Sequence, residues 1–149
     1  MAGAELDDID ERIVRALEAD GRLSMRQLAE QVHISRANAY ARVERLTTSG
    51  VITGFTATTD PVARGLGTSA YVTMNVRQTD WRSIHTQLRR LSGIEHIALV
   101  GGDFDVVLLA RAKDNADLRR LVLDEIQAIP GVVNTRTLLI FEESFPHQP

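Results

Sequence analysis

A run of polar side chains between Ser35 and Arg45 carries the groups that proteins use to read DNA. Arginine can form two hydrogen bonds with a guanine edge, and asparagine can do the same with adenine. Arg36 and Asn38 stand near the start of the run, and Arg42 follows one helical turn later. We expect the first residues to approach bases, and Arg42 and Arg45 to contact phosphates or to brace the domain.

The local charge around this run favours phosphate contact, although the chain as a whole is acidic. The 149 residues carry a net charge of −3, which argues against a strongly basic protein that coats DNA. Residues 21–50 nevertheless contain five arginines against two glutamates, a local charge of +3. We therefore predict contact with double-stranded DNA through Arg22, Ser24, Arg26, Ser35, Arg36, Ala37, Asn38, Tyr40, Arg42 and Arg45.

A second group of polar residues could bind a small charged molecule. Gly101 and Gly102 precede Asp103, Phe104 and Asp105. Glycine lets the backbone approach a ligand closely, its N–H groups can receive a carboxylate, and an aspartate can hold an ammonium group. The same five residues could equally form an ordinary tight hairpin in which the aspartates are turn formers.

The sequence lacks the residue patterns that catalysis or metal binding would require. The chain has no cysteine, and its four histidines show no spacing typical of zinc ligands. An enzyme would need a nucleophile, a base and an oxyanion site, or a metal cluster, in one cleft. Asp103 and Asp105 are the only close carboxylate pair in a loop, and no histidine motif accompanies them. We expect no catalytic residue and no metal site, and hence a protein that is not an enzyme.

One glycine motif resembles a cofactor site but lacks the context for one. Residues 65–70 match the dinucleotide pattern G-x-G-x-x-A. That pattern requires a strand before it and a helix opening at its end. Here Asp60 and Pro61 begin a linker that runs to about Leu66, and the strand-like sequence AYVTMNV follows. We therefore expect no cofactor.

The DNA-reading residues require a helix, and apolar spacing predicts three helices before residue 50. Residues 6–19 repeat apolar side chains at helical intervals, after Asp7 as a cap. Ser24 can cap a second helix, which ends in a turn at His33, and Ser35 can cap the third. The inward face of the third helix consists of Ala39, Val43 and Leu46.

Residues 51–60 have the composition of a strand, with Gly54 inside. A short hairpin or extended arm at this position would be a wing, so residues 1–60 are predicted to form a winged helix-turn-helix domain, with a linker at about 60–66. A helical pair with exposed arginines also occurs in other α-rich domains, so the pattern alone does not settle the function.

Residues 67–149 are predicted to alternate as strand, helix, strand, strand, helix, strand. The strands are expected at 68–77, 94–100, 106–111 and 132–141, with helices after Asp80 and after Asp114 or Asn115. Two similar segments, Leu91-Ser92-Gly93-Ile94 and Ile129-Pro130-Gly131-Val132, each end a helix and start a strand. The chain is therefore predicted to be α+β, with a ferredoxin-like βαββαβ domain after the winged helix-turn-helix.

This second domain is predicted to need a partner. Residues 106–110 and 138–141 are apolar at consecutive positions, so both faces of the sheet need cover, while two helices cover only one. We predict a homodimer packed sheet against sheet, which also suits the reading of two half-sites. The alternative is that the linker or the N-terminal domain covers some of these residues.

Short motifs along nearly the whole chain match one known family. In the N-terminal half they are Leu6-Asp7-Asp8-Ile9-Asp10, Asp20-Gly21-Arg22-Leu23-Ser24, Leu28-Ala29, Ile34-Ser35, Arg42-Val43-Glu44-Arg45-Leu46, Gly50-Val51-Ile52-Thr53-Gly54-Phe55, Ala57 and Asp60-Pro61. In the C-terminal half they are Gly102-Asp103-Phe104-Asp105 and Pro130-Gly131-Val132. Together they resemble the Lrp/AsnC (feast/famine) transcriptional regulators. The resemblance implies a C-terminal effector-binding, oligomerising domain of RAM or ACT-like type, dimers that commonly assemble to octamers, and control by amino acids or related metabolites.

The resemblance favours the ligand-binding interpretation of the glycine-aspartate loop. The predicted effector-binding residues are Gly101, Gly102, Asp103, Phe104, Asp105, Val106, Thr135 and Thr137. Val106 stands where many family members carry tyrosine, and the loop holds no basic residue, so we expect a small apolar amino acid or a branched-chain keto acid. His33 stands where the family usually has glycine, which predicts a positive φ there.

The sequence thus predicts a sequence-specific transcriptional regulator that responds to a metabolite and controls genes of amino-acid metabolism. No apolar run reaches transmembrane length, and the acidic start does not resemble a signal peptide, so we expect a cytoplasmic protein without membrane contact. The alternatives are an architectural DNA-compacting protein, or a small metabolite-binding subunit or enzyme built on the ferredoxin-like domain.

Overall fold

The computed structural model describes residues 6–144, which divide into two compact units, one ending at Thr58 and the other beginning at Thr59. Each unit is described by itself. Within the described part of the chain, no helix combines the length and apolar character needed to cross a membrane.

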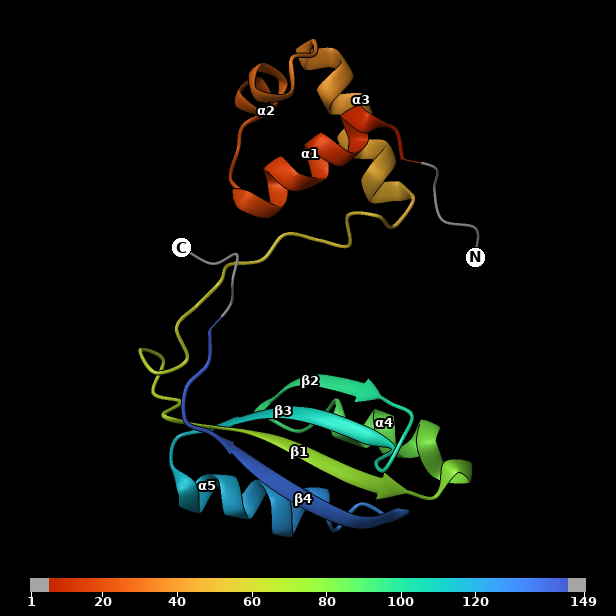
Figure 1. Cartoon of the computed structure of the whole chain (residues 1–149), viewed down its shortest axis with the longest axis vertical. Coiled ribbons are helices and arrows are strands. Elements are labelled where there is room, and N and C mark those ends of the chain that lie inside the picture. The colour runs from red at the N-terminus through yellow and green to blue at the C-terminus, as the bar shows by residue number, and fades with distance from the viewer. Residues whose placement is uncertain (1–5, 145–149) are drawn as a thin grey trace. The chain divides into compact units, whose positions relative to one another are not determined.

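Three helices form the N-terminal unit: α1 (Asp8–Ala19), α2 (Met25–Val32) and α3 (Arg36–Thr48) (Figure 1). Ile13, Leu28 and Leu46, one from each helix, are fully buried and form the centre of its core. Ala39 is also fully buried, and Val43 packs against the same core, as the apolar spacing of the third helix predicted. The three inward stripes explain why these short helices are stable together, although none would be stable alone.

Side-chain caps set where these helices begin. The Asp7 carboxylate accepts hydrogen bonds from the backbone N–H of Ile9 and Asp10, and Ser24 forms the predicted capping box with Gln27. His33 ends α2 in the left-handed region, at φ 56° and ψ 51°, which confirms the positive φ expected there.

The segment after α3 contains no hairpin. Val51 and Ile52 pack against the three-helix core, and residues 53–60, all of them described, are exposed and form no strand. Of the two forms predicted for a wing, the structure therefore has the extended arm. A two-stranded ribbon needs further strands or a helix to cover it, and the N-terminal unit offers no sheet that it could extend.

The C-terminal unit has the predicted ferredoxin-like order. Its elements are β1 (Thr68–Val76), α4 (Trp81–Leu88), β2 (Ile94–Leu99), β3 (Val106–Ala112), α5 (Asn115–Arg120) and β4 (Val132–Ile140). All neighbouring strands pair antiparallel, in the spatial order β2-β3-β1-β4. Both helices lie on the same side of the sheet (Figure 1).

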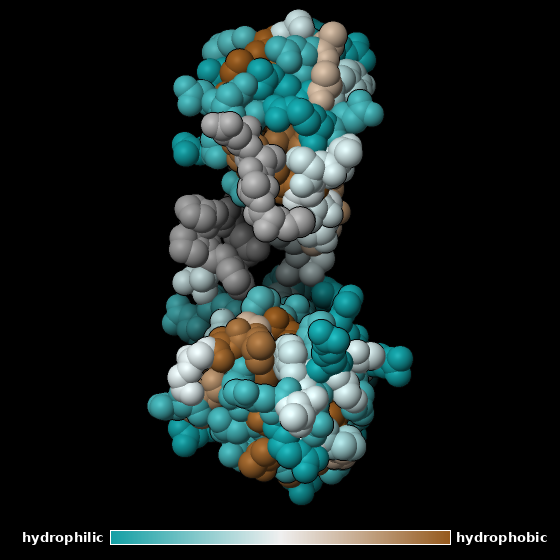
Figure 2. Space-filling view, turned by 90° about the vertical axis from the view of Figure 1, so that its right-hand side faces the viewer, coloured by the Kyte–Doolittle hydropathy of each residue, from teal (hydrophilic) through white to brown (hydrophobic). Residues whose placement is uncertain are grey.

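The two faces of this sheet differ in cover. Val72 and Met74 of β1 point toward the helices and are fully buried with Ile84 of α4. Tyr71 points to the other face, where its partners in register are Leu109 of β3 and Leu138 of β4. Tyr71 and Leu138 remain exposed, and hydrophobic residues gather at the surface of this unit in Figure 2.

Two helix starts in this unit test the predicted caps. Asp114 caps α5 by accepting from the backbone N–H of Asp117. The predicted capping role of Asp80 is wrong, because its side chain makes no capping hydrogen bond and instead pairs with Arg77 at 3.0 Å. Asp80 belongs to a 3₁₀ turn, η1 (Gln78–Asp80), which leads directly into α4 and removes the extended cap geometry.

Candidate nucleic-acid interface and effector site

The exposed side of α3 brings together several of the predicted DNA-contacting residues. Arg36, Asn38 and Tyr40 are all exposed in the first two turns. The Arg36 guanidinium lies over the Tyr40 ring, 5.7 Å from its centroid. This cation–π contact joins two side chains that lie one helical turn apart on α3. Ala37 and Ala41 lie between these polar groups and are exposed too. Because their side chains are small, the backbone of α3 can approach a binding partner closely here.

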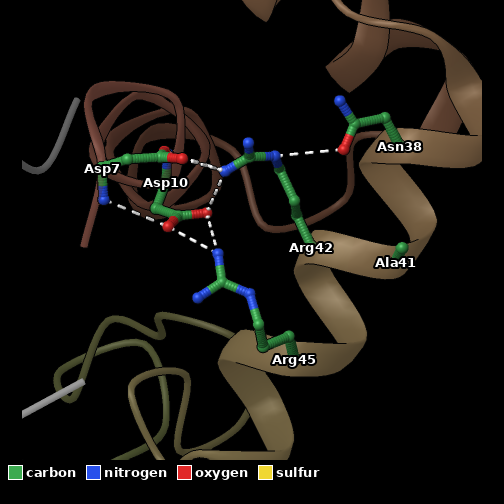
Figure 3. Close-up of a pocket in the computed structure, with 6 residues that line it drawn as sticks. All are labelled: Asp7, Asp10, Asn38, Ala41, Arg42 and Arg45. Atoms are coloured by element: carbon green, nitrogen blue, oxygen red, sulfur yellow. Dashed lines mark hydrogen bonds and ion pairs between the residues drawn. The ribbon is translucent and has the colours of Figure 1, made fainter. Parts of the chain in front are cut away.

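Arg42 and Arg45 point instead toward the start of α1 (Figure 3). Nη1 of Arg42 lies 2.7 Å from a carboxylate oxygen of Asp7 and 2.8 Å from one of Asp10. Nη2 of Arg45 lies 2.6 Å from both carboxylate oxygens of Asp10. Of the two roles predicted for this pair of arginines, bracing the domain is the one the geometry supports.

Asp10 is the buried centre of this ion cluster. Its side chain is only 1% exposed, whereas the Asp7 side chain is 53% exposed. Burial opposes the charge on Asp10, but hydrogen bonds from Arg45 and Arg42 outweigh it and lower the pKa of Asp10 to about 2. Hydrogen bonds to the two carboxylates raise the pKa of Arg42, and the bond to Asp7 contributes more than the bond to Asp10. The cluster is thus ionised at neutral pH and ties α3 to α1.

Asn38 joins this cluster from the exposed side of α3. Its Oδ1 accepts a hydrogen bond of 3.1 Å from Nε of Arg42. The side chains of Asp7, Asp10, Asn38, Ala41, Arg42 and Arg45 surround a hollow of about 470 Å³. Sequence reasoning missed Asp7 and Asp10 here, because an acidic residue in a first helical turn already has a sufficient explanation in the helix dipole.

The other residues predicted to contact DNA are of two kinds: serines that cap helices and arginines that lie exposed at the surface. The hydroxyls of Ser24 and Ser35 accept from the backbone N–H of Gln27 and Asn38, so both serines cap helices. Arg26 forms an exposed ion pair with Glu30, 3.0 Å long. Arg22 is exposed on the turn before α2.

A polar hollow of about 440 Å³ lies beside the glycine-aspartate loop. It is lined by Asn75, Asp103, Phe104, Asn134, Thr135 and Arg136. The Arg136 guanidinium lies over the Phe104 ring, 5.6 Å from its centroid. Nδ2 of Asn75 donates to the backbone carbonyl of Asp103 at 3.0 Å, which fixes the loop against β1.

Only part of the predicted effector set lines this hollow. Asp103, Phe104 and Thr135 do, and the remaining five do not. Oδ2 of Asp105 accepts from the backbone N–H of Val76 at 2.9 Å, so this carboxylate stabilises the irregular end of β1. Val106 is fully buried in the core, and Gly101 and Gly102 are exposed in the loop.

Arg136, Asn75 and Asn134 are the lining residues that sequence reasoning missed. The loop itself holds no basic residue, but β4 brings Arg136 beside it from 33 positions away in the chain. The alternation of β4 contained the available signal, since Arg136 pairs in register with Thr73 on the face that the helices do not cover. Among residues 6–144, no group of three or more histidine and acidic side chains could hold a metal ion.

A three-helix unit with an exposed, arginine-bearing third helix, followed by a ferredoxin-like unit with a polar hollow, defines a helix-turn-helix DNA-binding protein with a separate ligand-binding module. Residues 6–53 match the family model for winged helix-turn-helix DNA-binding, and residues 69–149 match that for the Lrp/AsnC ligand binding domain. The chain belongs to the Lrp/AsnC family of transcriptional regulators, and is a DNA-binding regulator whose activity a metabolite modulates.

Individual relatives agree along nearly the full length. The chain is 37% identical to the HTH-type transcriptional regulator AldR of Mycobacterium tuberculosis over 142 residues, which cover 93% of this chain and 79% of that protein. It is 35% identical to the leucine-responsive regulatory protein of Escherichia coli K12, covering 95% and 88%. The crystal structure of M. tuberculosis AldR superposes with a TM-score of 0.79 at 32% identity, covering 95% of this chain and 97% of that one. A Neisseria meningitidis regulator in complex with L-Met shares the fold, with a TM-score of 0.88 at 22% identity, covering 97% of each chain.

Proposed function

We propose that this regulator reads its operator with the first two turns of α3, placing Arg36, Ala37, Asn38 and Tyr40 toward the bases in the major groove. The observation that carries the proposal is the division of α3 into two sides. Three side chains, those of Arg36, Asn38 and Tyr40, are exposed to solvent. By contrast, Arg42 and Arg45 are held by carboxylates at the start of α1. Arg22 and Arg26 on the neighbouring turn and helix are placed to contact phosphates.

A gel shift over several salt concentrations tests this assignment, with upstream DNA of the gene and scrambled DNA as probes. Arg36→Ala should weaken binding to the operator by about 1–3 kcal/mol and change base preference. Arg15→Ala, on the exposed side of α1, removes the same charge and should leave base preference unchanged. Equal affinity for both probes in the wild type would favour the architectural alternative, and negligible binding to both would contradict the assignment.

We infer that the effector is an α-amino acid bound in the hollow beside the glycine-aspartate loop. Arg136 can receive its carboxylate, Asp103 its ammonium, and the amides of Asn75 and Asn134 its remaining polar atoms. A keto acid lacks the ammonium and would place its carboxylate group in a site that also contains Asp103. The relative from E. coli K12 is named as leucine-responsive, which supports an amino acid as the effector. We infer that the target genes belong to amino-acid metabolism.

A thermal-shift screen of amino acids and branched-chain keto acids tests the effector site. A ligand present at a hundred times its dissociation constant should stabilise the fold by about 2.7 kcal/mol. Asp103→Asn and Arg136→Gln should each abolish the shift, whereas Arg119→Gln on the exposed side of α5 should preserve it. A shift that survives in both variants would place the effector elsewhere.

The proposed regulator works as a homodimer that forms through the sheet face that α4 and α5 leave uncovered. These dimers assemble further. A C2 dimer would present two copies of α3 to two half-sites. We infer that it acts in the cytoplasm, where its DNA target is accessible.

A further inference from the structure

The orientation of the Asn38 amide is set by a relay of polar groups that begins in the core of the N-terminal unit. Asp10 is 1% exposed and holds Nη1 of Arg42 at 2.8 Å, and Asp7 holds the same atom at 2.7 Å. The Arg42 side chain is itself only 19% exposed. Its Nε then donates to Oδ1 of Asn38 at 3.1 Å. Each step fixes the next side chain in place.

This relay determines which end of the amide faces outward. A guanidinium can only donate, so the oxygen of Asn38 and not its nitrogen must face Arg42. Figure 3 shows Nδ2 of Asn38 turned away from Arg42. Asn38 is exposed, and no hydrogen bond from Nδ2 to another described residue is found in this structure. The side chain therefore offers a free, fixed donor on the side of α3 that is proposed to enter the groove.

We propose that Asn38 is a specificity-determining residue that donates through Nδ2 to an acceptor on a base edge, and that Arg42, held by Asp7 and Asp10, is its positioning residue. The inference rests on the proposed recognition role of α3. Purines present N7 in the major groove, guanine also O6, and thymine O4, whereas cytosine presents only its N4 donor. A fixed donor accepts adenine, guanine or thymine at the contacted position and rejects cytosine. The second lone pair of Oδ1 stays open and can add a contact with N6 of adenine, whereas an amide free to rotate could turn Oδ1 toward N4 of cytosine and lose the discrimination against it.

The test begins with a binding site selected from a random duplex library by the full-length wild-type protein. All four bases are then compared at each position of that site. One position should show cytosine bound roughly 5- to 100-fold more weakly than the other three bases, the cost of facing a donor with a donor. Ratios between bases, and not absolute affinities, are the measured quantity.

Asn38→Asp changes the donor and keeps the relay. Its carboxylate can still accept from Nε of Arg42, so folding should be preserved, but no donor remains for the base. A carboxylate accepts from N4 of cytosine, so the preference at this position should invert toward cytosine. The added negative charge weakens binding to every sequence alike and cancels in the ratio.

Arg42→Lys and Arg45→Lys form a matched pair for the positioning role. Both keep the positive charge beside Asp10, but only Arg42 contacts Asn38. Lysine has one charged nitrogen and cannot bridge Asp10 and Asn38 as the guanidinium does. Arg42→Lys should therefore reduce the cytosine penalty at least severalfold, with circular dichroism and melting temperature showing a folded protein, and Arg45→Lys should leave the penalty intact.

The outcomes separate this inference from the function on which it rests. A wild type that selects no sequence would contradict the recognition role of α3. Selection in which no position rejects cytosine, or in which Asn38→Asp leaves the base ratios unchanged, would overturn the fixed-donor inference. An Arg42→Lys variant that weakens all bases equally would show Arg42 to be a phosphate contact and not a positioning residue.

Discussion

Asp10 links the stability of the N-terminal unit to its recognition helix. It is a carboxylate in the core, with both of its oxygens bonded to Arg45 and one also to Arg42. A buried charge is destabilising unless it is paired and hydrogen-bonded, and this one is fully paired. Removing the carboxylate takes away the partner of Arg45 and one of the two acidic partners of Arg42, so a single change on α1 acts on α3.

The pH dependence of unfolding should reveal this carboxylate. The pKa of Asp10 lies at about 2 in the folded state, below its ordinary value of 3.8, so ionised Asp10 stabilises the folded state. The stabilisation of about 2 kcal/mol is fully present above about pH 4 and is lost as pH falls toward 2. Asp10→Asn should lower the free energy of unfolding at pH 6 and flatten its decline between pH 5 and pH 2.

Urea unfolding followed by circular dichroism measures this difference between wild type and variant. Trp81 is the only tryptophan and lies in the C-terminal unit, so its fluorescence serves as an internal control that should not change. Coincident pH curves for the two proteins would show that the Asp10 carboxylate contributes no net stability.

Single residues show what sequence reasoning could reach at this scale. Asp7, Ser24 and His33 were predicted in their structural roles because caps and a left-handed turn depend on near neighbours in the chain. The pairing of Asp10 with Arg42 and Arg45, over 32 and 35 positions, depends on how α1 crosses α3. Arg136 was missed for the same reason, since its place beside Phe104 is fixed by strand pairing.

At the scale of elements, two glycines end helices and start strands. Gly93 and Gly131 have φ values of 92° and 97°, and each lies in one of the two similar segments noticed in the sequence. A Cβ on Gly93 would lie 2.6 Å from the carbonyl oxygen of Arg111, and one on Gly131 would lie 2.8 Å from Oδ2 of Asp80. Backbone conformation and space therefore both require glycine.

Gly131→Ala should destabilise the C-terminal unit by about 1–3 kcal/mol, through backbone strain and the close contact with Asp80. Gly101→Ala in the same unit is the matched control, because nothing lies within 4 Å of its Cβ position and its φ is not positive. This control should change stability by less than about 0.5 kcal/mol. Thermal unfolding followed by Trp81 fluorescence compares the two, and equal melting temperatures would contradict the expected strain.

Element types were predicted well and their irregularities were not. The order of strands and helices follows from the periodicity of apolar residues, which the core retains. After α5 the helix continues as a π-helical turn, η2 (Leu121–Ile126), in which the N–H of Gln127 bonds to the carbonyl of Val122. Apolar spacing cannot separate this turn from an α-helix, because Leu121, Val122 and Ile126 are buried in either form.

At the scale of the whole molecule, the sheet face that α4 and α5 leave uncovered exposes apolar side chains of the C-terminal unit. Tyr71 and Leu138 lie opposite each other on this face and are 42% and 49% exposed. Arg111 lies on the same face but is 5% exposed, and is satisfied by Glu95 and Glu143 at 2.6 and 2.8 Å. The part of the face around Tyr71 and Leu138 is therefore apolar, and the charge of buried Arg111 beside it is neutralised, which suits contact with a second copy.

Leu138→Asp should dissociate the assembly without unfolding the protomer. An aspartate at this half-exposed site is solvated in the monomer, but it would be buried without a partner between two sheets. Leu108→Asp is unsuitable as a probe, because Leu108 is fully buried on the helix-covered face and its replacement would unfold the domain. Val62→Asp, at a 70% exposed position before β1, introduces the same charge and should leave the molar mass unchanged. Light scattering at micromolar concentration should give at least a dimer for wild type and Val62→Asp, and a smaller, folded species for Leu138→Asp. A monomeric wild type, or a Leu138→Asp variant of unchanged mass, would show that this face is not the one that joins the subunits.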